Sequence, residues 1–375
     1  LYFGKKCEPR PTFGKPDWFA IVAREVEQAH RRAAIFEQST LGKIDVLGVD
    51  ACRFLERICT NRMDRAPGSA IYTMMLNEGG GIESDLTAIR IADDHYRLFV
   101  GTTAIKRDLT WPRRQLAIGE DAAIVDRTED FAVIGLMGLM TAGILDALGA
   151  SELSDLGYFK STTGHIAGLA VRAVRLSYVG EAGFEISCSP GAALRVYDAL
   201  HAEGARPAGL YAQTSMRIEK RFLAYGHDLD IDVTPLEAGL DFAVDWQKDF
   251  IGREALQEHR RQPLATSLVT IVLDELDAVP LGSEPVYRDG RIIGKTTSAA
   301  FGHRIGRPLA LAYLDVMETP IVDGTLVEVD VAGVRFEGQV CLTAAFDPQG
   351  QRMRSVQAHS LRQGRSVPIL TETGS

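Results

Sequence analysis

The chain has 375 residues, of which 46% are hydrophobic and 24% charged, so its length and composition are those of a globular protein with two or three domains. It carries 41 Lys and Arg residues against 50 Asp and Glu residues, a formal net charge of -9. The basic surface that binding to phosphate backbones requires is lacking, which excludes nucleic acid as an expected partner.

Cysteine usage and the short apolar runs predict a cytoplasmic protein that does not enter a membrane. The 5 cysteines, an odd number without any C-x-x-C pair, are typical of reduced thiols in a cytosolic protein. The longest uncharged run, residues 131–145, is shorter than the roughly 20 residues of a membrane span, and we interpret it as a buried strand followed by a helix. Residues 1–10 contain no apolar h-region, so no secretory signal is expected, and the start at Leu1 rather than Met indicates a trimmed or fragmentary chain.

The first two thirds of the chain alternate helical and strand patterns in irregular order. Apolar residues at three- and four-residue steps between positions 18 and 36 predict an amphipathic helix. Segments rich in β-branched, aromatic and aliphatic residues predict strands at 43–49, 96–100 and 170–178. Further helices are predicted at 51–59, 104–116, 192–203 and 212–223. This irregular mixture favours an α+β fold over a doubly wound parallel sheet.

The pattern changes near residues 262 and 263, where short alternating segments separated by glycine turns begin. These segments lie at 268–273, 285–288, 326–331 and 335–340. They predict a small all-β domain over residues 263–346, after an α+β domain over residues 18–262. From Asp347 onward polar residues dominate without periodicity, so residues 347–375 are expected to form a loosely attached polar tail.

The histidines and glycine-rich segments predict neither a metal site nor a dinucleotide site. No H-x-x-x-H, H-E-x-x-H or Cys/His cluster occurs, so no metal site is expected. The segment GRIIGKT at 290–296 has a glycine spacing one residue short of a Walker phosphate loop, and we interpret it as a β-hairpin. No G-x-G-x-x-G follows a strand, so no flavin site is expected in this chain.

The first candidate site is a strand, a glycine turn and a second strand at residues 72–87 (YTMMLNEGGGIESDLT). Composition alone favours a plain β-hairpin in which Asp85 is a solvated turn residue. The alternative starts from the position of Asp85, which lies past the turn in a segment that continues as LTAI. A carboxylate on a rigid strand beside a flexible turn can be aimed at a substrate proton.

The second candidate site, residues 175–186 (RLSYVGEAGFEI), again predicts a strand, a tight turn and a strand. In the simpler interpretation Tyr178 packs within the strand and Glu181 lies on the turn surface. In the alternative, Gly180 and Gly183 let the backbone approach a planar ligand, on which Tyr178 stacks while Glu181 accepts two parallel N–H bonds. Neither segment decides between these alternatives by itself.

Together the two segments resemble the glycine-cleavage T-protein superfamily, the tetrahydrofolate-dependent aminomethyltransferases and their relatives. GGIESD at 80–85 matches the family motif G-G-[IV]-x-x-D, and YVGEAGFE at 178–185 matches Y-x-G-E-x-G-[FW]-E. Further segments match in the family's order: SMRIEK at 215–220, YGHD at 225–228, TPLEAGL at 234–240 and FIGREAL at 250–256. The resemblance covers residues 18–346 and implies a T-protein-like, cloverleaf-like folate-binding domain followed by a small C-terminal β-barrel.

The start of the chain resembles one branch of this superfamily. FGK at 3–5 and FGKPDWF at 13–19 resemble the joining region of dimethylglycine and sarcosine dehydrogenases or oxidases, where a flavin domain runs into the folate domain. IFEQS at 35–39 and SDLT at 84–87 also resemble that branch. Residues 1–17 are therefore expected to be a joining segment. The chain is expected to be either a free-standing folate module or the folate part of a longer protein, and a flavin-dependent dehydrogenase domain or subunit is an expected partner.

The resemblance implies tetrahydrofolate as the cofactor and a set of site residues. Asp85 matches the family's catalytic aspartate, and Glu181 is expected on the pterin edge. The residues expected to line the folate pocket are Tyr72, Thr87, Val100, Tyr158, Phe159, Tyr178, Glu181, Gly183 and Arg217. Aromatic side chains suit pterin stacking and a carboxylate suits its amidine-like edge, so the inherited assignment agrees with the chemistry of these residue types.

Three functions remain open for such a site. The first is transfer of a one-carbon group, as methyl, methylene or aminomethyl, from an N-methylated amino acid or its iminium to tetrahydrofolate. The second is tetrahydrofolate-dependent demethylation of an O-, S- or N-methyl substrate, such as a sulfonium compound or an aryl ether. The third is a non-catalytic folate-binding regulator, which an intact Asp85 disfavours. In the first two, a carboxylate can take the proton that the folate nitrogen loses or stabilise the developing cation. No sequence feature identifies the small methylated donor.

Overall fold

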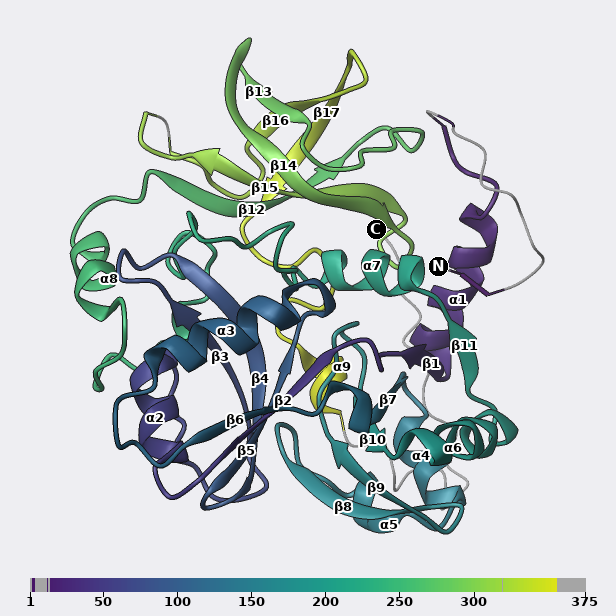
Figure 1. Cartoon of the computed structure of the whole chain (residues 1–375). Coiled ribbons are helices and arrows are strands. Elements are labelled where there is room, and N and C mark those ends of the chain that lie inside the picture. The colour runs from purple at the N-terminus through teal and green to yellow at the C-terminus, as the bar shows by residue number, and fades with distance from the viewer. Residues whose placement is uncertain (1, 4–11, 13, 319, 356–375) are drawn as a thin grey trace.

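The computed structural model describes residues 2, 3, 12, 14–318 and 320–355. Their strands form a six-stranded sheet, a five-stranded sheet and a closed barrel, and the barrel lies above the two sheet-containing lobes in Figure 1. The predicted joining segment lies largely outside the described residues. The mixed α and β content and the C-terminal barrel confirm the predicted fold class.

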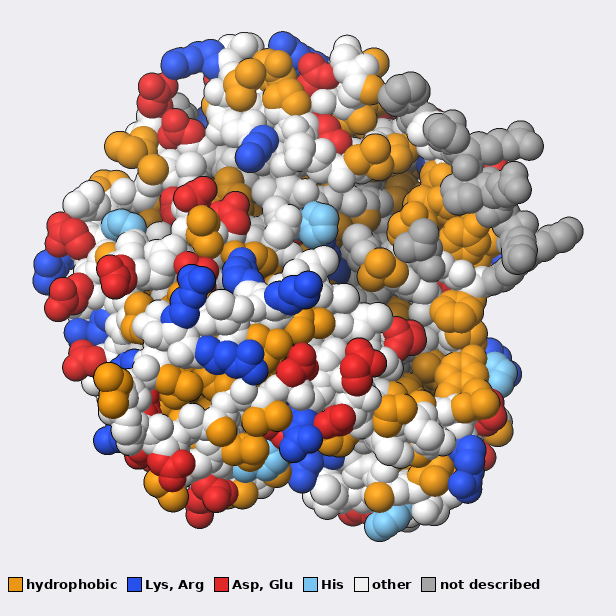
Figure 2. Space-filling model, in the orientation of Figure 1, with side chains coloured by type: hydrophobic (Ala, Val, Ile, Leu, Met, Phe, Trp, Pro, Cys, Tyr) orange, Lys and Arg blue, Asp and Glu red, His pale blue; other side chains and the backbone are white. Residues whose placement is uncertain are grey.

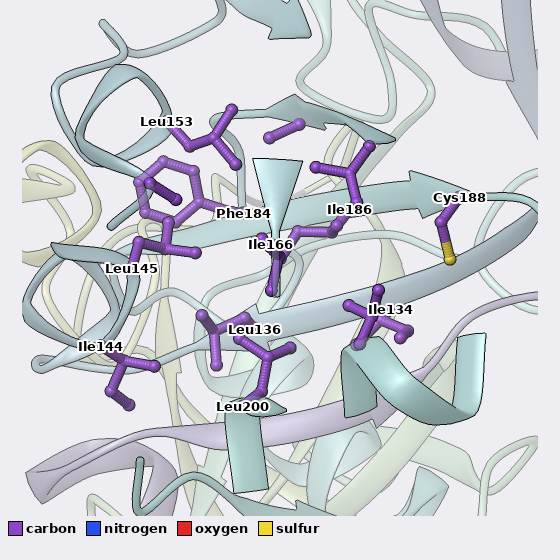
Figure 3. Packing of buried hydrophobic residues seen from close by; sticks show 14 of the residues in the cluster. Ile134, Leu136, Ile144, Leu145, Leu153, Ile166, Phe184, Ile186, Cys188 and Leu200 are labelled. Atoms are coloured by element: carbon purple, nitrogen blue, oxygen red, sulfur yellow. The ribbon is translucent and has the colours of Figure 1, made fainter. Parts of the chain in front are cut away.

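The six-stranded sheet has the order β11-β1-β7-β10-β9-β8. Its strands are β1 (Ala34–Glu37), β7 (Ala132–Met137), β8 (Ser161–Ile166), β9 (Leu169–Val174), β10 (Gly183–Cys188) and β11 (Arg206–Ala208). The helices that follow β7 and β10 are α4 (Thr141–Ala147), α5 (Ser151–Ser154) and α6 (Pro190–Ala202). On the outer face of the sheet Leu136, Phe184 and Ile186 pack with residues of these helices in one buried cluster (Figure 3). Because successive strand residues point to opposite sides, Glu185 faces the inner side of the sheet.

The five-stranded sheet has the order β3-β4-β5-β2-β6. Its strands are β2 (Gly42–Leu47), β3 (Ala70–Leu76), β4 (Ile82–Ala92), β5 (His95–Val100) and β6 (Ala123–Asp126). Helices α2 (Ala51–Ile58) and α3 (Ile105–Gln115) cover one face, where Phe54, Leu86 and Leu98 belong to a buried cluster. The opposite face of β4 and β5 is the inner face of this sheet.

The inner faces of the two sheets meet in a small apolar contact. Ile89 of β4 and Phe99 of β5 pack with Val133 of β7 and Val174 of β9. Side chains of polar residues next to this contact, on either sheet, therefore face each other across the interface between the two lobes.

A pair of helices, α1 (Phe19–Arg31) and α7 (Leu210–Glu219), lies between these lobes and the barrel. Helix α1 packs with α7 through Val22, Val26 and Met216. The helix predicted over residues 18–36 ends at Arg31, earlier than expected. Strand β1 begins at Ala34, and Ile35 and Phe36 are buried on opposite sides of the sheet.

The barrel is closed and consists of six antiparallel strands. These are β12 (Thr266–Leu273), β13 (Pro285–Arg288), β14 (Arg291–Gly302), β15 (Arg307–Asp315), β16 (Leu326–Val331) and β17 (Val334–Cys341), and helix α8 (Arg253–Arg260) precedes them. The segment GRIIGKT belongs to the β13–β14 hairpin, as the sequence predicts. The barrel packs on α7, where the Ser215 hydroxyl donates to the Phe301 carbonyl over 2.7 Å.

The expectation that residues after Asp347 are loosely attached is wrong for the described residues 347–355. They include helix α9 (Gln351–Arg354), where Met353 is buried and the Arg352 guanidinium donates to the Glu181 carboxylate over 2.6 Å. One buried side chain and a few ionic contacts hold this segment, so it shows no apolar periodicity. Residues 356–375 lie outside the described residues.

Charged side chains of both signs are spread over the face of the molecule in Figure 2. Basic side chains gather near its centre, over α3, whose exposed residues include Lys106, Arg113 and Arg114. The net charge of -9 is thus not expressed as a uniformly acidic surface. No helix in the described part of the chain combines the length and the apolar composition that crossing a membrane requires.

Candidate functional site

Asp85 lies within β4 on the inner face of the five-stranded sheet. Tyr72 on β3 and Thr87 on β4 are directly opposite each other, and Asp85 is two residues before Thr87 on the same face. The Tyr72 hydroxyl donates to Oδ2 of Asp85 over 3.2 Å. The interpretation of Asp85 as a solvated turn residue is therefore wrong, because a strand and a neighbouring hydroxyl fix its position.

The surroundings of Asp85 favour a proton acceptor that works near neutral pH. Burial raises the pKa of Asp85 to about 6, the hydrogen bond from Tyr72 lowers it, and the charges of Asp108 and Asp228 raise it. Burial likewise raises the pKa of Asp108 to about 6, and the Ser84 hydroxyl donates to that carboxylate over 2.9 Å. A carboxylate with a pKa near 6 is a stronger base than an ordinary aspartate and is still mostly ionised at pH 7.

Two pairs of stacked aromatic rings stand beside this carboxylate. Tyr72 stacks on Phe242 with ring centroids 6.2 Å apart, and Tyr178 stacks on Phe222 with centroids 6.0 Å apart. Burial, and then the nearby groups Asp85 and Tyr178, raise the pKa of Tyr72 well above its ordinary value. The two tyrosines and Asp85 therefore belong to one neighbourhood that offers planar faces next to a charge.

Tyr178 is positioned differently from the prediction. Strand β9 ends at Val174 and β10 begins at Gly183, so residues 175–182 form a connection rather than a tight turn between strands. The Tyr178 hydroxyl donates to the Leu223 carbonyl over 2.7 Å, which ties this connection to the chain after α7. Gly183 is needed because a Cβ there would lie 2.9 Å from the Leu176 carbonyl oxygen.

Glu181 lies in a buried ionic cluster, and 1% of its side chain is exposed. Arg304 donates to its Oε1 over 2.9 Å, Arg352 donates to its Oε2 over 2.6 Å, and Nδ1 of His30 lies 2.9 Å from Oε1. Arg304 also binds Glu219 over 2.5 Å. Both oxygens of Glu181 thus have cationic or imidazole partners from three distant parts of the chain, and its contact with a pterin edge stays a prediction.

Arg217 also has its hydrogen-bonding capacity in use. Its guanidinium donates to Asp228 over 2.6 Å, to Ser298 over 2.7 Å and to the Phe222 carbonyl over 3.1 Å. These bonds hold the segment that carries Phe222 and Tyr225 against the barrel. In this arrangement Arg217 orients the aromatic residues of the site.

The remaining predicted pocket residues divide between the inner face and other places. Thr87 and Phe159 lie on the inner side, where Phe159 packs against the contact between the two sheets. Tyr158 meets the Phe159 ring edge to face, with centroids 4.8 Å apart, and its hydroxyl lies 3.9 Å from the Met353 sulfur. Val100 is not brought to the site by its side chain, which is buried in the cluster beneath α2 and α3.

Glu185 is a candidate functional residue that the sequence analysis missed. It is 8% exposed and accepts a hydrogen bond from the Gln38 amide over 3.2 Å. It lies directly opposite Val174, which packs against Phe99 of the other sheet, so its carboxylate is on the face that looks toward the strands of Asp85. Burial raises the pKa of Glu185 to about 7, and the bond from Gln38 lowers it. The available signal is that Glu185 is the second glutamate of the YVGEAGFE motif, two residues after Gly183.

Metal-ligand clusters and surface cavities are the other places where a site could lie. Among residues 14–318 and 320–355, no group of three or more His, Cys, Asp or Glu residues is arranged to hold a metal ion. A cavity of about 750 Å³ lies at the outer side of the five-stranded lobe, where Arg57, Trp111 and Arg253 are among its lining residues. It contains none of the predicted site residues.

Two family models match successive parts of the chain. The GCVT N-terminal domain matches residues 2–248, and the glycine cleavage T-protein C-terminal barrel domain matches residues 267–347. The second match covers the strands of the closed barrel.

Similar proteins of established name include dehydrogenases and aminomethyltransferases. Human mitochondrial dimethylglycine dehydrogenase is 30% identical over 342 residues, which cover 89% of this chain and 39% of that protein. Mouse mitochondrial sarcosine dehydrogenase is 32% identical over 375 residues, which cover 92% of this chain and 40% of that protein. The aminomethyltransferase of Desulfitobacterium hafniense (strain DSM 10664 / DCB-2) is 30% identical over 341 residues and is covered over 92% of its length. The chain thus spans about 40% of the two dehydrogenases and nearly all of the aminomethyltransferase.

A solved structure agrees with these matches at the level of the fold. The glycine cleavage system aminomethyltransferase T from Bartonella henselae superposes with a TM-score of 0.78 and 24% sequence identity, covering 85% of this chain and 88% of that one. The sequence motifs, the two matched domains and the shared fold lead to one conclusion. The chain belongs to the glycine cleavage T-protein family, which includes the aminomethyltransferases.

Proposed function

We propose that this chain binds tetrahydrofolate between the inner faces of its two sheets and transfers a one-carbon unit to it, with Asp85 as the acid–base group. The observation that carries this proposal is the position of Asp85, held on β4 by the Tyr72 hydroxyl beside stacked aromatic rings. Family membership supports the same chemistry.

The residues of the site fit a reduced pterin. Tyr72 and Tyr178 offer aromatic faces for stacking, and Thr87 and Phe159 lie on the same inner side. A buried carboxylate with spare acceptor capacity suits the N–H groups of the pterin edge, and Glu185 has such capacity because it accepts a single bond from Gln38 among the described residues. Glu181 would have to release Arg304, Arg352 or His30 before it could play that part.

Bound tetrahydrofolate supplies a nitrogen nucleophile that accepts the one-carbon unit. When that nitrogen bonds to the one-carbon unit it must lose a proton, which ionised Asp85 can accept. The bond between that carbon and the donor's nitrogen breaks, and the donor leaves as the free amine. Tyr72 fixes the carboxylate so that one oxygen stays directed away from the hydroxyl. The negative charge of Asp85 also favours a cationic donor, such as an iminium or ammonium group, over a neutral one.

An N-methylated amino acid or its iminium is the donor that we propose. The relatives named dimethylglycine dehydrogenase and sarcosine dehydrogenase favour this class, and the charge of Asp85 agrees with it. A sulfonium compound, which is also cationic, and an aryl ether, which is neutral, are the alternatives. Folate binding without turnover of any donor would instead indicate the regulatory function.

A flavin-dependent dehydrogenase domain or subunit is the partner that we propose. The chain matches about 40% of dehydrogenases whose names imply an oxidation step, while the aminomethyltransferase is matched nearly whole. The absence of a flavin site in this chain and the cytosolic location both stay predictions.

The function is tested by incubating purified protein with tetrahydrofolate and a panel of N-methylated amino acids, sulfonium compounds and aryl ethers. N-methylated amino acids are supplied both alone and with an amine-oxidising flavoenzyme that generates the iminium. We expect methyl- or methylene-tetrahydrofolate to form from the N-methyl donors, above the rate without protein. No folate product with any donor, in protein that binds tetrahydrofolate, would overturn the transfer function.

A further inference from the structure

The amide of Gln38 is the hydrogen-bond donor to Glu185. Gln38 directly follows β1, and its backbone N–H donates to the Val133 carbonyl over 3.0 Å. Its side-chain nitrogen Nε2 then reaches the Glu185 carboxylate over 3.2 Å. Gln38 is 6% exposed and Glu185 8%, so the bond is shielded from water.

The other end of the same amide has no partner. Oε1 of Gln38 is buried and forms no hydrogen bond with any described residue. A buried carbonyl without a donor costs stability, and a leucine of similar size at this position would avoid that cost. The reverse orientation of the amide would bring Oε1 against the carboxylate, two acceptors facing each other, so Glu185 selects the orientation that leaves Oε1 unpaired.

A glycine on the neighbouring strand makes room for this amide. Gly135 of β7 is the cross-strand partner of Glu185 on one side and of Phe36 on the other. A Cβ at Gly135 would lie 2.6 Å from Oε1 of Gln38 and 3.2 Å from the Met137 methyl carbon. An alanine there would push the Gln38 side chain away from Glu185. Three features therefore support the bond from Gln38 to Glu185. The donor Nε2 is buried, Oε1 of the same amide has no partner among the described residues, and Gly135 leaves space for the amide.

We propose that Gln38 is a positioning residue that holds the Glu185 carboxylate ionised and turned toward the ligand between the two sheets. This inference rests on the proposed function, in which Glu185 accepts N–H groups of the pterin. A carboxylate in a dry site without a donor tends to take up a proton, and a protonated carboxyl group can no longer accept two parallel N–H bonds.

The charged groups around Glu185 do not replace this donor. On the strands that adjoin or face Glu185, these groups are Arg172 on β9, opposite Ser187, and Lys43 and Arg97 on the inner face of the other sheet. Lys43 donates to the carbonyls of Ser39 and Leu41, and Arg97 forms a two-pronged ion pair with Asp45. Arg172 donates to the Ser161 hydroxyl over 3.3 Å. The bond from Gln38 is thus the direct contact that opposes the effect of burial on the pKa of Glu185, which stands at about 7.

The first test measures tetrahydrofolate affinity between pH 5.5 and 9 for the natural protein and for Gln38→Leu. Without the donor, Glu185 should ionise at higher pH, so affinity at pH 7 should fall about 3- to 10-fold and recover at pH 9. Loss of the same factor at every pH would indicate a structural effect only and would overturn the inference. Gln38→Met serves as a second apolar variant if Gln38→Leu fails to fold.

Gln28→Leu is the matched control. The Gln28 amide donates to the Ala33 carbonyl over 3.2 Å, the same distance as the bond from Gln38 to Glu185, and lies in the same region of the fold. It makes no recorded contact with Glu185, so this variant should leave the pH dependence of folate binding unchanged. A shift equal to that of Gln38→Leu would show that the effect is not specific to Glu185.

A double variant tests whether Gln38 acts through Glu185. Glu185→Gln removes the charge, so adding Gln38→Leu to it should change tetrahydrofolate affinity by less than about twofold. Independent, multiplying effects of the two substitutions would overturn the positioning role.

A measurement without ligand separates this inference from the proposed function. The Glu185 carboxyl carbon is titrated by NMR in both proteins, with Glu185→Gln used to assign the signal. Coincident titrations in the natural protein and Gln38→Leu would overturn the role of Gln38. Failure of the natural protein to bind tetrahydrofolate would overturn the proposed function, whatever the titrations show.

Discussion

The hydroxyl of Tyr72 and the carboxylate of Asp85 meet across neighbouring strands of the five-stranded sheet, 3.2 Å apart. The register of β3 and β4 places them on one face, so the donor is supplied by the same hairpin that carries the acceptor. The orientation of Asp85 is consequently set within the strands and not by the glycine turn that joins them.

Asp85→Asn should retain tetrahydrofolate binding and lose turnover. The amide keeps the size of the side chain but cannot accept a proton, and general-base contributions are typically about a hundred- to ten-thousand-fold. The measurement compares steady-state rates at saturating tetrahydrofolate with a competent methyl donor. Asp94→Asn, at an exposed residue in the turn after β4, is the control and should keep its rate. Rates of Asp85→Asn within about twofold of the natural protein would refute the acid–base role.

Turnover should rise with pH through a midpoint near 6. Burial raises the pKa of Asp85 to about 6, and the ionised form is the one that accepts a proton, so the rate increases as pH rises through that value. Tyr72→Phe removes a hydrogen bond that lowers the pKa, so its midpoint should move upward. Rate profiles of the natural protein and Tyr72→Phe between pH 5 and 8 provide the check, and a flat profile would contradict this assignment.

Asp85→Asn should also stabilise the protein at neutral pH. The pKa of Asp85 is about 6 in the folded state and near the ordinary value of 3.8 in the unfolded state, so the folded state binds more protons between these values and stability falls as pH rises through them. Removing the charge should raise the free energy of unfolding at pH 7.5 by about 1 to 3 kcal/mol. At pH 3.5 most of the gain should vanish, because Asp85 is then protonated in the folded state and mostly protonated in the unfolded state. Urea unfolding at the two pH values measures the difference.

Glu185→Gln and Glu181→Gln should have different consequences. Loss of a charge-assisted pair typically costs about 1.5 to 3 kcal/mol, and for Glu185→Gln that loss should appear in tetrahydrofolate affinity rather than in turnover at saturation. Glu181→Gln leaves buried Arg304 with one carboxylate partner fewer and should lower the thermal midpoint. Folate titration and thermal unfolding of both variants separate the two roles. A large loss of affinity in Glu181→Gln with unchanged stability would instead support the original prediction that Glu181 contacts the pterin.

Two arginines of the Glu181 cluster should differ in their importance for stability. The Arg304 side chain is 1% exposed and joins two carboxylates, whereas the Arg352 side chain is 32% exposed. Breaking a buried ion pair typically costs about 3 to 5 kcal/mol, and a partly exposed one about 1 kcal/mol or less. Arg304→Gln should therefore lower the free energy of unfolding several times more than Arg352→Gln. Equal losses in chemical denaturation would contradict this ranking.

Local sequence patterns predicted much of the fold. The helices at 51–59 and 104–116 and the strand at 96–100 match α2, α3 and β5 to within a residue at each end. The hairpin that carries Asp85 follows from its glycine turn and alternating residues. The proposal of a tetrahydrofolate site follows from the motifs. These features are determined by residues close together in the sequence, so local patterns are enough to predict them.

The rest of the site depends on contacts between distant segments. The partners of Glu181 come from positions 30, 304 and 352, and no local pattern predicts that they converge. The inner-face position of Glu185 follows only from the packing of two sheets through Phe99 and Val174. The apolar neighbours of Tyr178 predict a strand, but the connection that contains it is held by contacts with distant segments, among them the bond from Tyr178 to the Leu223 carbonyl and the bond from Arg304 to the Val179 carbonyl.

The contact of α9 with Glu181 has a consequence for the order of folding. Arg352 is 171 positions after Glu181, and the entire barrel lies between them in the chain. The two sheet-containing lobes can therefore fold during synthesis while the Glu181 carboxylate still lacks Arg352. The ion pair with Arg352 can form only after the barrel has been synthesised. Long-range closures of this kind are slow because a large loop must be ordered first. The barrel follows the α+β domain in the sequence. The last contact to form in the α+β domain is nevertheless made by helix α9, which follows the barrel.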